Sequence, residues 1–246
     1  MTRFDEKVIL LTGAARGLGR AASRLLSERG GSLALVDIRE QEVVDLAAEL
    51  GADAKPFVAD LSSVGEIGDA VECIVEAFGR IDVLINNAAI CPRIPFGDAT
   101  EEDWDRQFDI NAKSQYFLMQ AVCPVMRRQG GGRIVNVISA SGQFGAVANA
   151  SIYSGTKGAI VAFTKSVARE VVGDGITVNC FSPGTMLTEQ ITNLSSERQE
   201  AVRQMIPMGR FTSPEEMAIS LAYVASDECV YTTGATFDFI GGSYMR

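Results

Sequence analysis

Short runs of consecutive apolar residues recur along the chain and are separated by longer segments with helical periodicity. Apolar runs of this length are typical of parallel strands that are buried on both faces. The periodic segments between them are long enough to be crossover helices. The runs lie at 8–11, 33–36, 57–59, 81–85, 134–138, 176–181 and 236–240. This pattern predicts an α/β fold, a doubly wound seven-stranded parallel sheet with helices on both faces.

Helical patterns extend from about residue 17 to Arg29, and over 64–78, 98–128 and 153–172, and a last helix opens at Ser213-Pro214. The segment 186–212 is weakly patterned and carries few large apolar side chains. We therefore expect it to form a mobile lid over a substrate site. Because the chain contains no internal repeat, low-complexity segment or linker, residues 1–246 are predicted to form a single domain.

Charge and composition exclude several classes of function. The formal net charge of −9 argues against a nucleic-acid or anionic membrane partner. No apolar run approaches the length of a membrane span. The chain has no histidine, which excludes histidine-based acid/base catalysis and most catalytic zinc sites, so we expect no metal. Five cysteines without a C-x-x-C spacing indicate reduced thiols in a cytoplasmic protein: Cys73, Cys91, Cys123, Cys180 and Cys229.

A glycine-rich turn joins the first strand to the first helix. After Thr12 the spacing is G-x-x-x-G-x-G, formed by Gly13, Gly17 and Gly19. A strand, such a turn and a helix together present free backbone N–H groups and a positive helix end to a pyrophosphate, as in Rossmann-type dinucleotide sites. It is not a P-loop, because no Gly-Lys-Ser/Thr follows. The alternative is a tight turn that simply requires glycine.

Acidic residues stand at the ends of the second and third strands. A carboxylate at Asp37 can accept both hydroxyls of an adenosine ribose and would repel a 2′-phosphate, which favours NAD over NADP. Arg16 and Arg39 are basic neighbours that could soften this preference, and a plain surface aspartate is the alternative. Asp60, in Asp60-Leu61, is placed to contact the adenine amino group.

Asparagines and serines mark the ends of later elements. Asn86 and Asn87 close a buried strand, where their amides can bond backbone groups of a ligand loop or cap a turn. Asn111 lies inside a predicted helix, where asparagine is a poor helix former. It could hold a kink or a water, or face solvent. After the strand at 134–138, Ser139 or Ser141 can hydrogen-bond a substrate oxygen.

Tyr153 and Lys157 are four residues apart and share one face if the segment is helical. To act as a base at neutral pH, a phenol needs its pKa lowered by about three units, or about 4 kcal/mol. One positive charge at ~4 Å supplies about that much at an effective dielectric of ~20. The pair is therefore electrically sufficient for proton transfer. Taken alone, the two could also be unrelated residues on one helix.

These motifs, in this order, resemble those of the short-chain dehydrogenase/reductase family, in its single-domain branch of about 250 residues. The resemblance runs from the first strand to Gly242. It rests on the glycine turn after Thr12, Asp60-Leu61, Asn86-Asn87-Ala88, Asn111, Ser139, Tyr153-x-x-x-Lys157 and Pro183-Gly184. Ala89 stands where glycine is usual, and Ile138 replaces a frequent serine.

The resemblance implies the site's roles. Tyr153 would be the general acid/base, and Lys157 would lower its pKa and bind the nicotinamide ribose. Ser139 would orient the substrate oxygen, and Asn111 would hold a water that links Lys157 to solvent. Thr188 would contact the nicotinamide carboxamide beside Ile138. The expected cofactor-binding set is Gly13, Arg16, Gly17, Leu18, Gly19, Asp37, Asp60, Leu61, Asn87, Ala88, Tyr153, Lys157, Pro183, Gly184, Met186 and Thr188.

The expected substrate pocket is largely apolar, which suits a small to medium secondary alcohol or its ketone. Its residues would be Ser139, Ser141, Gln143, Phe144, Tyr153 and Leu187, with Ile94, Phe96 and Met186. Ser139 and Tyr153 are one residue further apart than is commonest, so Ser141 could be mistaken for the catalytic serine. Gly142 and Gly145 fit the family's spacing from Ser139 and favour it. Arg93 could bind an acidic group or be an exposed loop residue.

Family members of this size are usually tetramers, so we expect a homotetramer. The helices near 101–128 and 153–172 and the C-terminal segment would form its interfaces. The apolar residues Phe117, Leu118, Ala121 and Val122 fit such an interface or an internal core. Two other functions are open: a catalytically idle NAD-binding regulator of this fold, and a methyltransferase-like nucleotide binder with a similar first turn.

Overall fold

Seven parallel strands form one sheet in the order β3-β2-β1-β4-β5-β6-β7 in the computed structural model, which describes residues 2–145 and 149–245. This confirms the doubly wound sheet predicted from the apolar runs. The order reverses between β1 and β4, where a ligand site is expected in open α/β sheets. The strands are β1 (Val8–Thr12), β2 (Ser32–Asp37), β3 (Ala54–Val58), β4 (Val83–Asn86), β5 (Gly132–Val137), β6 (Ile176–Pro183) and β7 (Thr236–Phe239).

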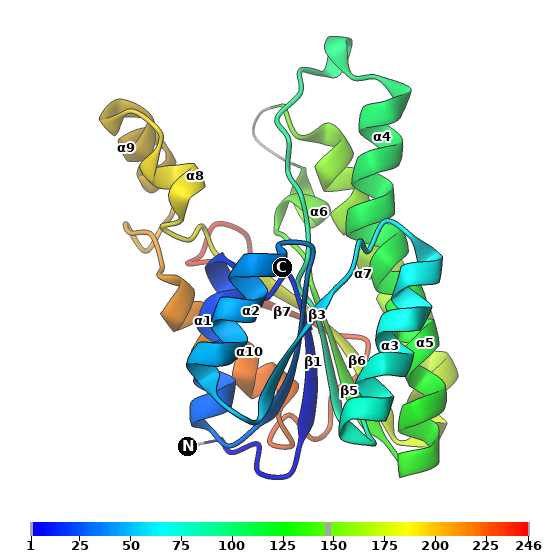
Figure 1. The fold of residues 1–246 in the computed structure, drawn as a ribbon. Helices are drawn as coiled ribbons and strands as arrows, with labels where there is room; N and C mark the ends of the chain where they lie inside the picture. The colour runs from blue at the N-terminus through cyan, green and yellow to red at the C-terminus, as the bar shows by residue number, and fades with distance from the viewer. Residues whose placement is uncertain (1, 146–148, 246) are drawn as a thin grey trace.

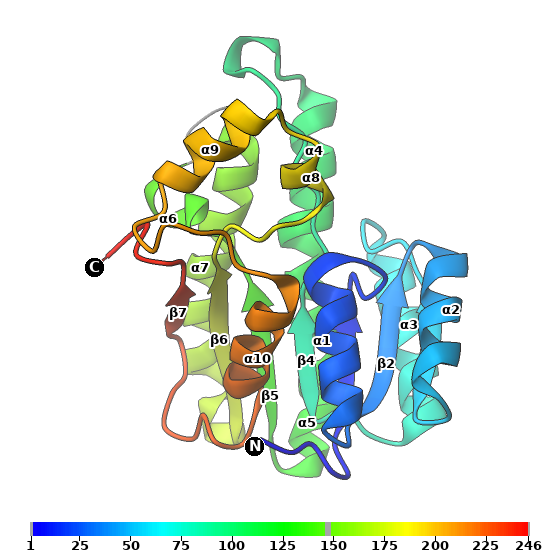
Figure 2. The ribbon, with the colours of Figure 1, turned by 90° about the vertical axis from the view of Figure 1, so that its left-hand side faces the viewer.

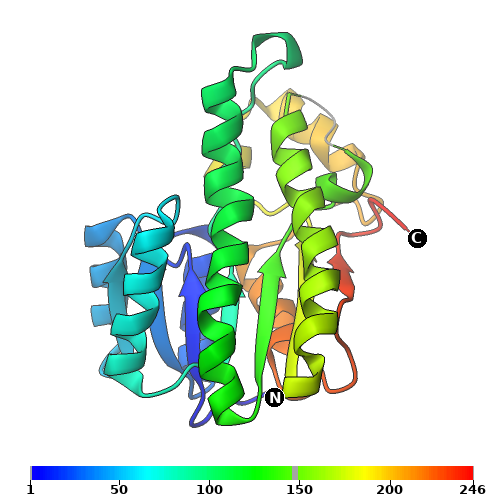
Figure 3. The same ribbon diagram turned by 90° about the vertical axis from the view of Figure 1, so that its right-hand side faces the viewer.

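Helices cover both faces of the sheet (Figure 1). One face carries α1 (Gly17–Glu28), α2 (Glu40–Leu50) and α10 (Pro214–Ala225). The other carries α3 (Val64–Phe78), α5 (Ser114–Gln129) and α7 (Ser151–Val171), which lie side by side in Figure 3. The sequence analysis did not identify α2, although Val43, Leu46 and Ala47 give it a buried face at helical spacing.

The single helix predicted over 98–128 is interrupted. The 3-10 turn η1 (Phe96–Asp98) is followed by α4 (Glu101–Phe108), which starts at a capping box between Thr100 and Asp103. A π-helical turn, η2 (Asp109–Lys113), separates α4 from α5. Such π turns occur within helices and frequently mark functional sites. Asn111 lies at its centre.

Of the four apolar residues of α5 that were considered for an interface or the core, two belong to the core and two are only partly buried. Leu118 and Val122 are 1% and 0% exposed, and Phe117 and Ala121 pack partly buried against the same cluster. Leu118 and Val122 are therefore not available to contact another subunit.

The predicted lid contains two short helices, α8 (Glu189–Thr192) and α9 (Ser196–Gln204), above the carboxyl edge of the sheet (Figure 2). The sequence did not indicate them because none of the described residues of α9 is buried, so no apolar face marks the helix. Two further short helices are α6 (Ser141–Phe144) and η3 (Val172–Asp174). Within the described residues, no helix combines the length and apolar character needed to cross a membrane.

Candidate active site

Close backbone packing explains the glycines of the turn between β1 and α1. Gly13 has φ +64°, and a Cβ there would lie 2.8 Å from Ala88 Cα. A Cβ at Gly19 would lie 2.0 Å from the Gly13 carbonyl oxygen. A Cβ at Gly17, which has φ +51°, would meet nothing within 4 Å among the described residues. The turn is thus packed on its inner side and open above the N-terminus of α1.

Asn87 and Thr12 hold this turn against the end of β4. Asn87 Nδ2 donates to the carbonyls of Thr12 and Gly13 at 3.0 and 3.1 Å. Thr12 Oγ1 accepts from the backbone N–H groups of Asn87 and Ala88 at 3.0 and 3.1 Å. Asn86 lies in the core and donates to Asn136 Oδ1 at 2.8 Å. Asn87 therefore fixes the glycine turn, whereas Asn86 ties β4 to β5 inside the core, and Thr12 supports the Asn87 contact.

Asp37, at the end of β2, reaches across to the same turn. Its carboxylate accepts from the backbone N–H groups of Ala15 at 2.9 Å and Arg39 at 3.0 Å. Arg16, the residue before α1, forms a bidentate ion pair with Glu42 of α2 at 2.6 and 2.8 Å. These contacts place the predicted ribose-binding carboxylate beside the glycine turn.

Three other predicted cofactor residues also lie near this edge. Asp60 Oδ1 accepts from the N–H of Ser62 at 2.9 Å, and its backbone N–H donates to Glu66 at 2.8 Å. Leu18 and Leu61 are buried in the core, with 5% and 7% exposure. Only their backbones could therefore touch a bound cofactor.

Ser139 and Tyr153 meet where β5 and α7 come together. Ser141 directs both its N–H and its hydroxyl at Ser139 Oγ, at 3.2 and 3.0 Å. A Cβ at Gly142 would lie 2.6 Å from the Lys157 carbonyl carbon, so glycine lets this turn pack on α7. The Ser139 side chain lies close enough to Tyr153 to lower the pKa of the phenol. The geometry thus places Ser139 next to the tyrosine, with Ser141 behind it.

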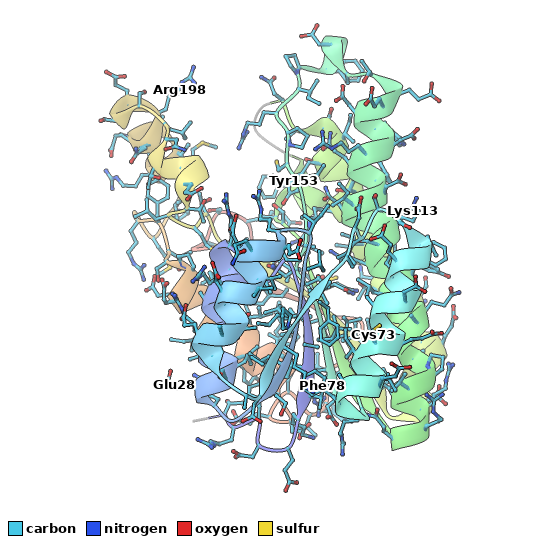
Figure 4. The ribbon with its side chains drawn as sticks, in the orientation of Figure 1. Glu28, Cys73, Phe78, Lys113, Tyr153 and Arg198 are labelled. Atoms are coloured by element: carbon cyan, nitrogen blue, oxygen red, sulfur yellow. The ribbon has the colours of Figure 1, made fainter. Side chains whose placement is uncertain are left out.

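Lys157 lies beneath Tyr153 on the same side of α7, as their spacing predicted. Its side chain is 1% exposed, and its Nζ donates to the Val137 carbonyl at 2.8 Å. The ammonium lies 5.7 Å from the centroid of the Tyr153 ring. Figure 4 shows Tyr153 above the carboxyl edge of the sheet.

The electrostatics of this pair differ from the prediction that Lys157 acidifies the phenol. Burial raises the pKa of Tyr153 to about 12, with the Cys91 thiol adding to the rise and the Ser139 hydrogen bond and Arg93 opposing it. Burial also lowers the pKa of Lys157 to about 8. Loss of hydration is therefore the largest cause of both shifts, and it keeps the phenol of Tyr153 protonated near neutral pH.

Asn111 uses its amide to hold the loop after β4. Its Oδ1 accepts from the N–H of Ile90 at 2.8 Å, and its Nδ2 donates to the Ile90 carbonyl at 2.9 Å. The same Nδ2 lies 3.3 Å from Thr156 Oγ1, which donates to the Tyr153 carbonyl at 2.7 Å. Asn111 faces inward at an irregular turn of helix and does not face solvent. Thr156, fully buried, is a further residue missed at the sequence level.

The loop held by Asn111 continues to Cys91 and Arg93, which both act electrostatically on Tyr153. Arg93 is exposed, yet its charge lies close enough to lower the pKa of the phenol. Cys91 is partly buried at the same place. Arg93 was expected beside the substrate pocket, whereas Cys91 was not assigned to the tyrosine's surroundings, because the two segments are about 60 residues apart along the chain.

The remaining predicted residues lie at the base of the lid. Pro183 ends β6, and a Cβ at Gly184 would approach the Phe239 carbonyl oxygen to 2.9 Å. Met186 pairs with Thr212 through a short β-bridge, and Thr188 precedes α8. A cavity of about 560 Å³ borders Gly184 and is lined also by Met208, Arg210, Asp238 and Tyr244.

The predicted substrate residues are not all brought together. Gln143 Nε2 donates to Asp238 of β7 at 2.7 Å, and Phe144 packs on Tyr244 with ring centroids 5.4 Å apart. Leu187 is half-exposed on the lid. Phe96 is 87% exposed in the loop that precedes α4 and projects above the rest of the chain (Figure 1).

Comparison with known proteins gives matches along nearly the whole chain. The family model described as enoyl-(acyl carrier protein) reductase matches residues 13–243. The 3-oxoacyl-[acyl-carrier-protein] reductase FabG of Thermotoga maritima is 36% identical over 243 residues, which cover 98% of each chain. The galactitol 2-dehydrogenase of Agrobacterium fabrum is 34% identical over 255 residues, covering 99% of each. The crystal structure of gox2181 superposes with a TM-score of 0.92 at 29% identity, covering 98% of this chain and 96% of that one.

Proposed function

The chain belongs to the short-chain dehydrogenase/reductase family, and on that premise we propose that it is an NAD-dependent oxidoreductase of secondary alcohols and their ketones. One observation carries the proposal: Tyr153 lies close enough to Ser139 for that side chain to lower its pKa, and it lies over the buried Lys157. This group stands at the edge of the sheet where the glycine turn also opens.

The residues around the glycine turn fit a dinucleotide. Arg16 is the N-cap residue of α1, and its side chain does not hydrogen-bond the first backbone N–H groups of the helix within the described residues. Those N–H groups can therefore receive a phosphate. The open space at Gly17 gives the phosphate room. Asp37 would take the ribose hydroxyls, which supports NAD over NADP. A bound nicotinamide would supply the hydride donor or acceptor and, when oxidised, a positive charge.

Tyr153 is the general acid/base in this proposal. Because its pKa is raised to about 12, the phenol stays protonated near neutral pH and can donate its proton to a carbonyl oxygen as that oxygen gains charge. Ser139 orients the oxygen from the other side. In the reverse direction Tyr153 takes the alcohol proton, and the Lys157 ammonium then stabilises the phenolate. We also propose that Asn111 positions a water beside Lys157.

The substrate is proposed to be small to medium and largely apolar. The apolar side chains of Met186 and Leu187, at the base of the lid, are in keeping with this, and Arg93 adds a cation near Tyr153 that could hold an acidic group. The segment 186–212 would close over the bound substrate. The protein would act in the cytoplasm, in keeping with five free cysteines, and assemble as a homotetramer.

Replacing the tyrosine tests the mechanism. Wild type, Tyr153→Phe and the matched control Tyr223→Phe, whose tyrosine is exposed on α10, would be assayed on a panel of alcohols and ketones with NAD and with NADP. Reduced nicotinamide is followed by absorbance. We expect Tyr153→Phe to lose at least about a hundredfold in kcat, and the control to keep its rate.

Calorimetry should show NADH binding to all three proteins. An unchanged Tyr153→Phe rate would disprove the assigned role. Binding by the wild type without any turnover would favour the idle regulator.

A further inference from the structure

Glu42 of α2 forms an ion pair with Arg16, the residue after Ala15, whose N–H donates to Asp37 at the proposed ribose site. Its two carboxylate oxygens accept from Arg16 Nε and Nη2 at 2.6 and 2.8 Å. One of the same oxygens also lies 3.5 Å from Arg39 Nη1. A single carboxylate therefore engages both cations that, from the sequence, could have offset the charge of Asp37.

Arg16 is placed so that its guanidinium would interact with a 2′-phosphate on the bound ribose. It follows Ala15, whose N–H donates to Asp37. The pKa of Arg16 is raised first by the hydrogen bonds and charge of Glu42, and also by the charges of Glu189 and Asp37. The guanidinium is about half exposed, with Glu189 of the lid 3.9 Å away. A free arginine here would present a planar pair of donors, which matches the geometry of a phosphate.

We propose that Glu42 is a specificity-determining residue that enforces the preference for a cofactor without a 2′-phosphate by keeping Arg16 engaged. This inference rests on the proposed function, in which the adenosine ribose binds at Asp37. A 2′-phosphate would have to break the bidentate ion pair between Arg16 and Glu42, and it would then face the Glu42 carboxylate as well as that of Asp37. Asp37 already repels the phosphate, and Glu42 removes the cation that could compensate.

A binding experiment with two adenosine nucleotides tests this without turnover. Adenosine 5′-monophosphate and adenosine 2′,5′-bisphosphate differ only in the 2′-phosphate. Their Kd values would be measured by calorimetry for wild type, Glu42→Gln, Glu40→Gln and the double variant Arg16→Gln/Glu42→Gln. Glu40 lies exposed in the first turn of the same helix, so its replacement removes an equal charge and leaves the Arg16 ion pair in place.

Glu42→Gln should bind the bisphosphate about tenfold more tightly relative to the monophosphate than wild type does. Glu40→Gln should keep the wild-type ratio, and the double variant should lose the gain. An equal gain in Glu40→Gln overturns the role of Glu42, and a gain that survives in the double variant overturns its action through Arg16, because Glu42 also engages Arg39. So does an unchanged ratio in Glu42→Gln when the monophosphate and NADH still bind. If wild type binds neither nucleotide nor NADH, the proposed function fails and this inference fails with it.

Discussion

At the scale of single residues, the unusual electrostatic feature is the ammonium of Lys157, which is buried beneath the phenol of Tyr153. Lys157 has its charge satisfied by one backbone carbonyl, and its side chain is 1% exposed. Keeping a charge in such a place costs folding free energy, because the protein replaces only part of the lost hydration. The cost appears as the lowered pKa of Lys157.

Replacing this lysine should change the pH dependence of stability in a defined direction. The pKa of Lys157 is about 8 in the folded chain, against an ordinary value of 10.5. Between these values the unfolded chain binds more protons than the folded chain, so the free energy of unfolding rises with pH. Below about pH 8 the folded chain bears the full cost. From about pH 7.5 to about pH 10, wild type should therefore gain about 2 kcal/mol relative to Lys157→Met.

Chemical denaturation at a series of pH values, followed by the fluorescence of the chain's single tryptophan, measures this difference. Lys165→Met is the matched control, because Lys165 is exposed on the same helix and its replacement removes an ammonium that stays in water in the folded chain. The explanation is wrong if the difference between wild type and Lys157→Met stays flat, or if Lys165→Met shows the same rise.

The pairing of these two residues was predictable and their pKa values were not. Tyr153 and Lys157 share a face because four residues make about one helical turn. The direction of each pKa shift depends on how closely β5, β6 and the loop after β4 surround the two side chains. The spacing of residues within one helix carries no information about this burial. Likewise, Cys91 and Arg93 come to Tyr153 only through the packing of a distant loop.

At the scale of secondary-structure elements, two side-chain amides hold the segments before and after β4 in place. Asn111 of the π turn bonds both the N–H and the carbonyl of Ile90, after the strand. Gln129, the last residue of α5, bonds both backbone groups of Ile81 before it, each at 3.0 Å. The same helical column thus holds the strand at both edges of the sheet, with matched chemistry.

Removing either amide should destabilise the chain, and only one should affect turnover. Asn111→Ala and Gln129→Ala each leave a backbone N–H and a carbonyl without their partner, so each should lower the free energy of unfolding by about 1–3 kcal/mol. Asn111 holds the loop that carries Cys91 and Arg93 to Tyr153, so its loss should also lower kcat by at least about tenfold. Gln129→Ala, at the opposite edge, should keep kcat within about twofold.

Denaturation curves and the rate on the best substrate of the alcohol panel give the two quantities. Equal losses of kcat in both variants would mean that Asn111 acts only through stability. Full activity in Asn111→Ala would remove its positioning role.

The elements that sequence analysis predicted well are those with a strong apolar pattern. The central strands and α3 were recognised because buried residues mark them, whereas β3 and β7 have few or no buried residues and were recognised only from short apolar runs. The π turn was not, because an amide that bonds a distant loop overrides the helical preference of residues 98–128. The lid helices α8 and α9 lack a buried face, and α2, with only three buried residues, was overlooked.

Aromatic side chains gather on the outer side of α5 and α7 at the scale of the whole molecule. Tyr116 is 41% exposed and meets the rings of Phe117 and Phe163 edge-on, at 5.6 and 5.9 Å. Trp104 of α4 is 50% exposed and stacks on Phe108. Exposed apolar groups of this kind mark surfaces that pair with another chain. Because Leu118 and Val122 are in the core, these outer rings support the proposed tetramer instead.

Placing a charge on this surface should therefore weaken assembly without unfolding the subunit. Wild type should sediment at about four times the subunit mass of 26.3 kDa. Tyr116→Glu puts an unpaired carboxylate into the interface, which costs several kcal/mol when desolvated and should shift the protein to dimers or monomers. Val58→Glu is the control, because Val58 is half-exposed on β3, the edge strand opposite β7 in the sheet order.

Sedimentation velocity at several concentrations separates the species, and far-ultraviolet circular dichroism verifies that each variant is folded. A monomeric wild type would end the tetramer proposal. If both variants dissociate to the same extent, the effect comes from added charge, and the aromatic surface is not the contact.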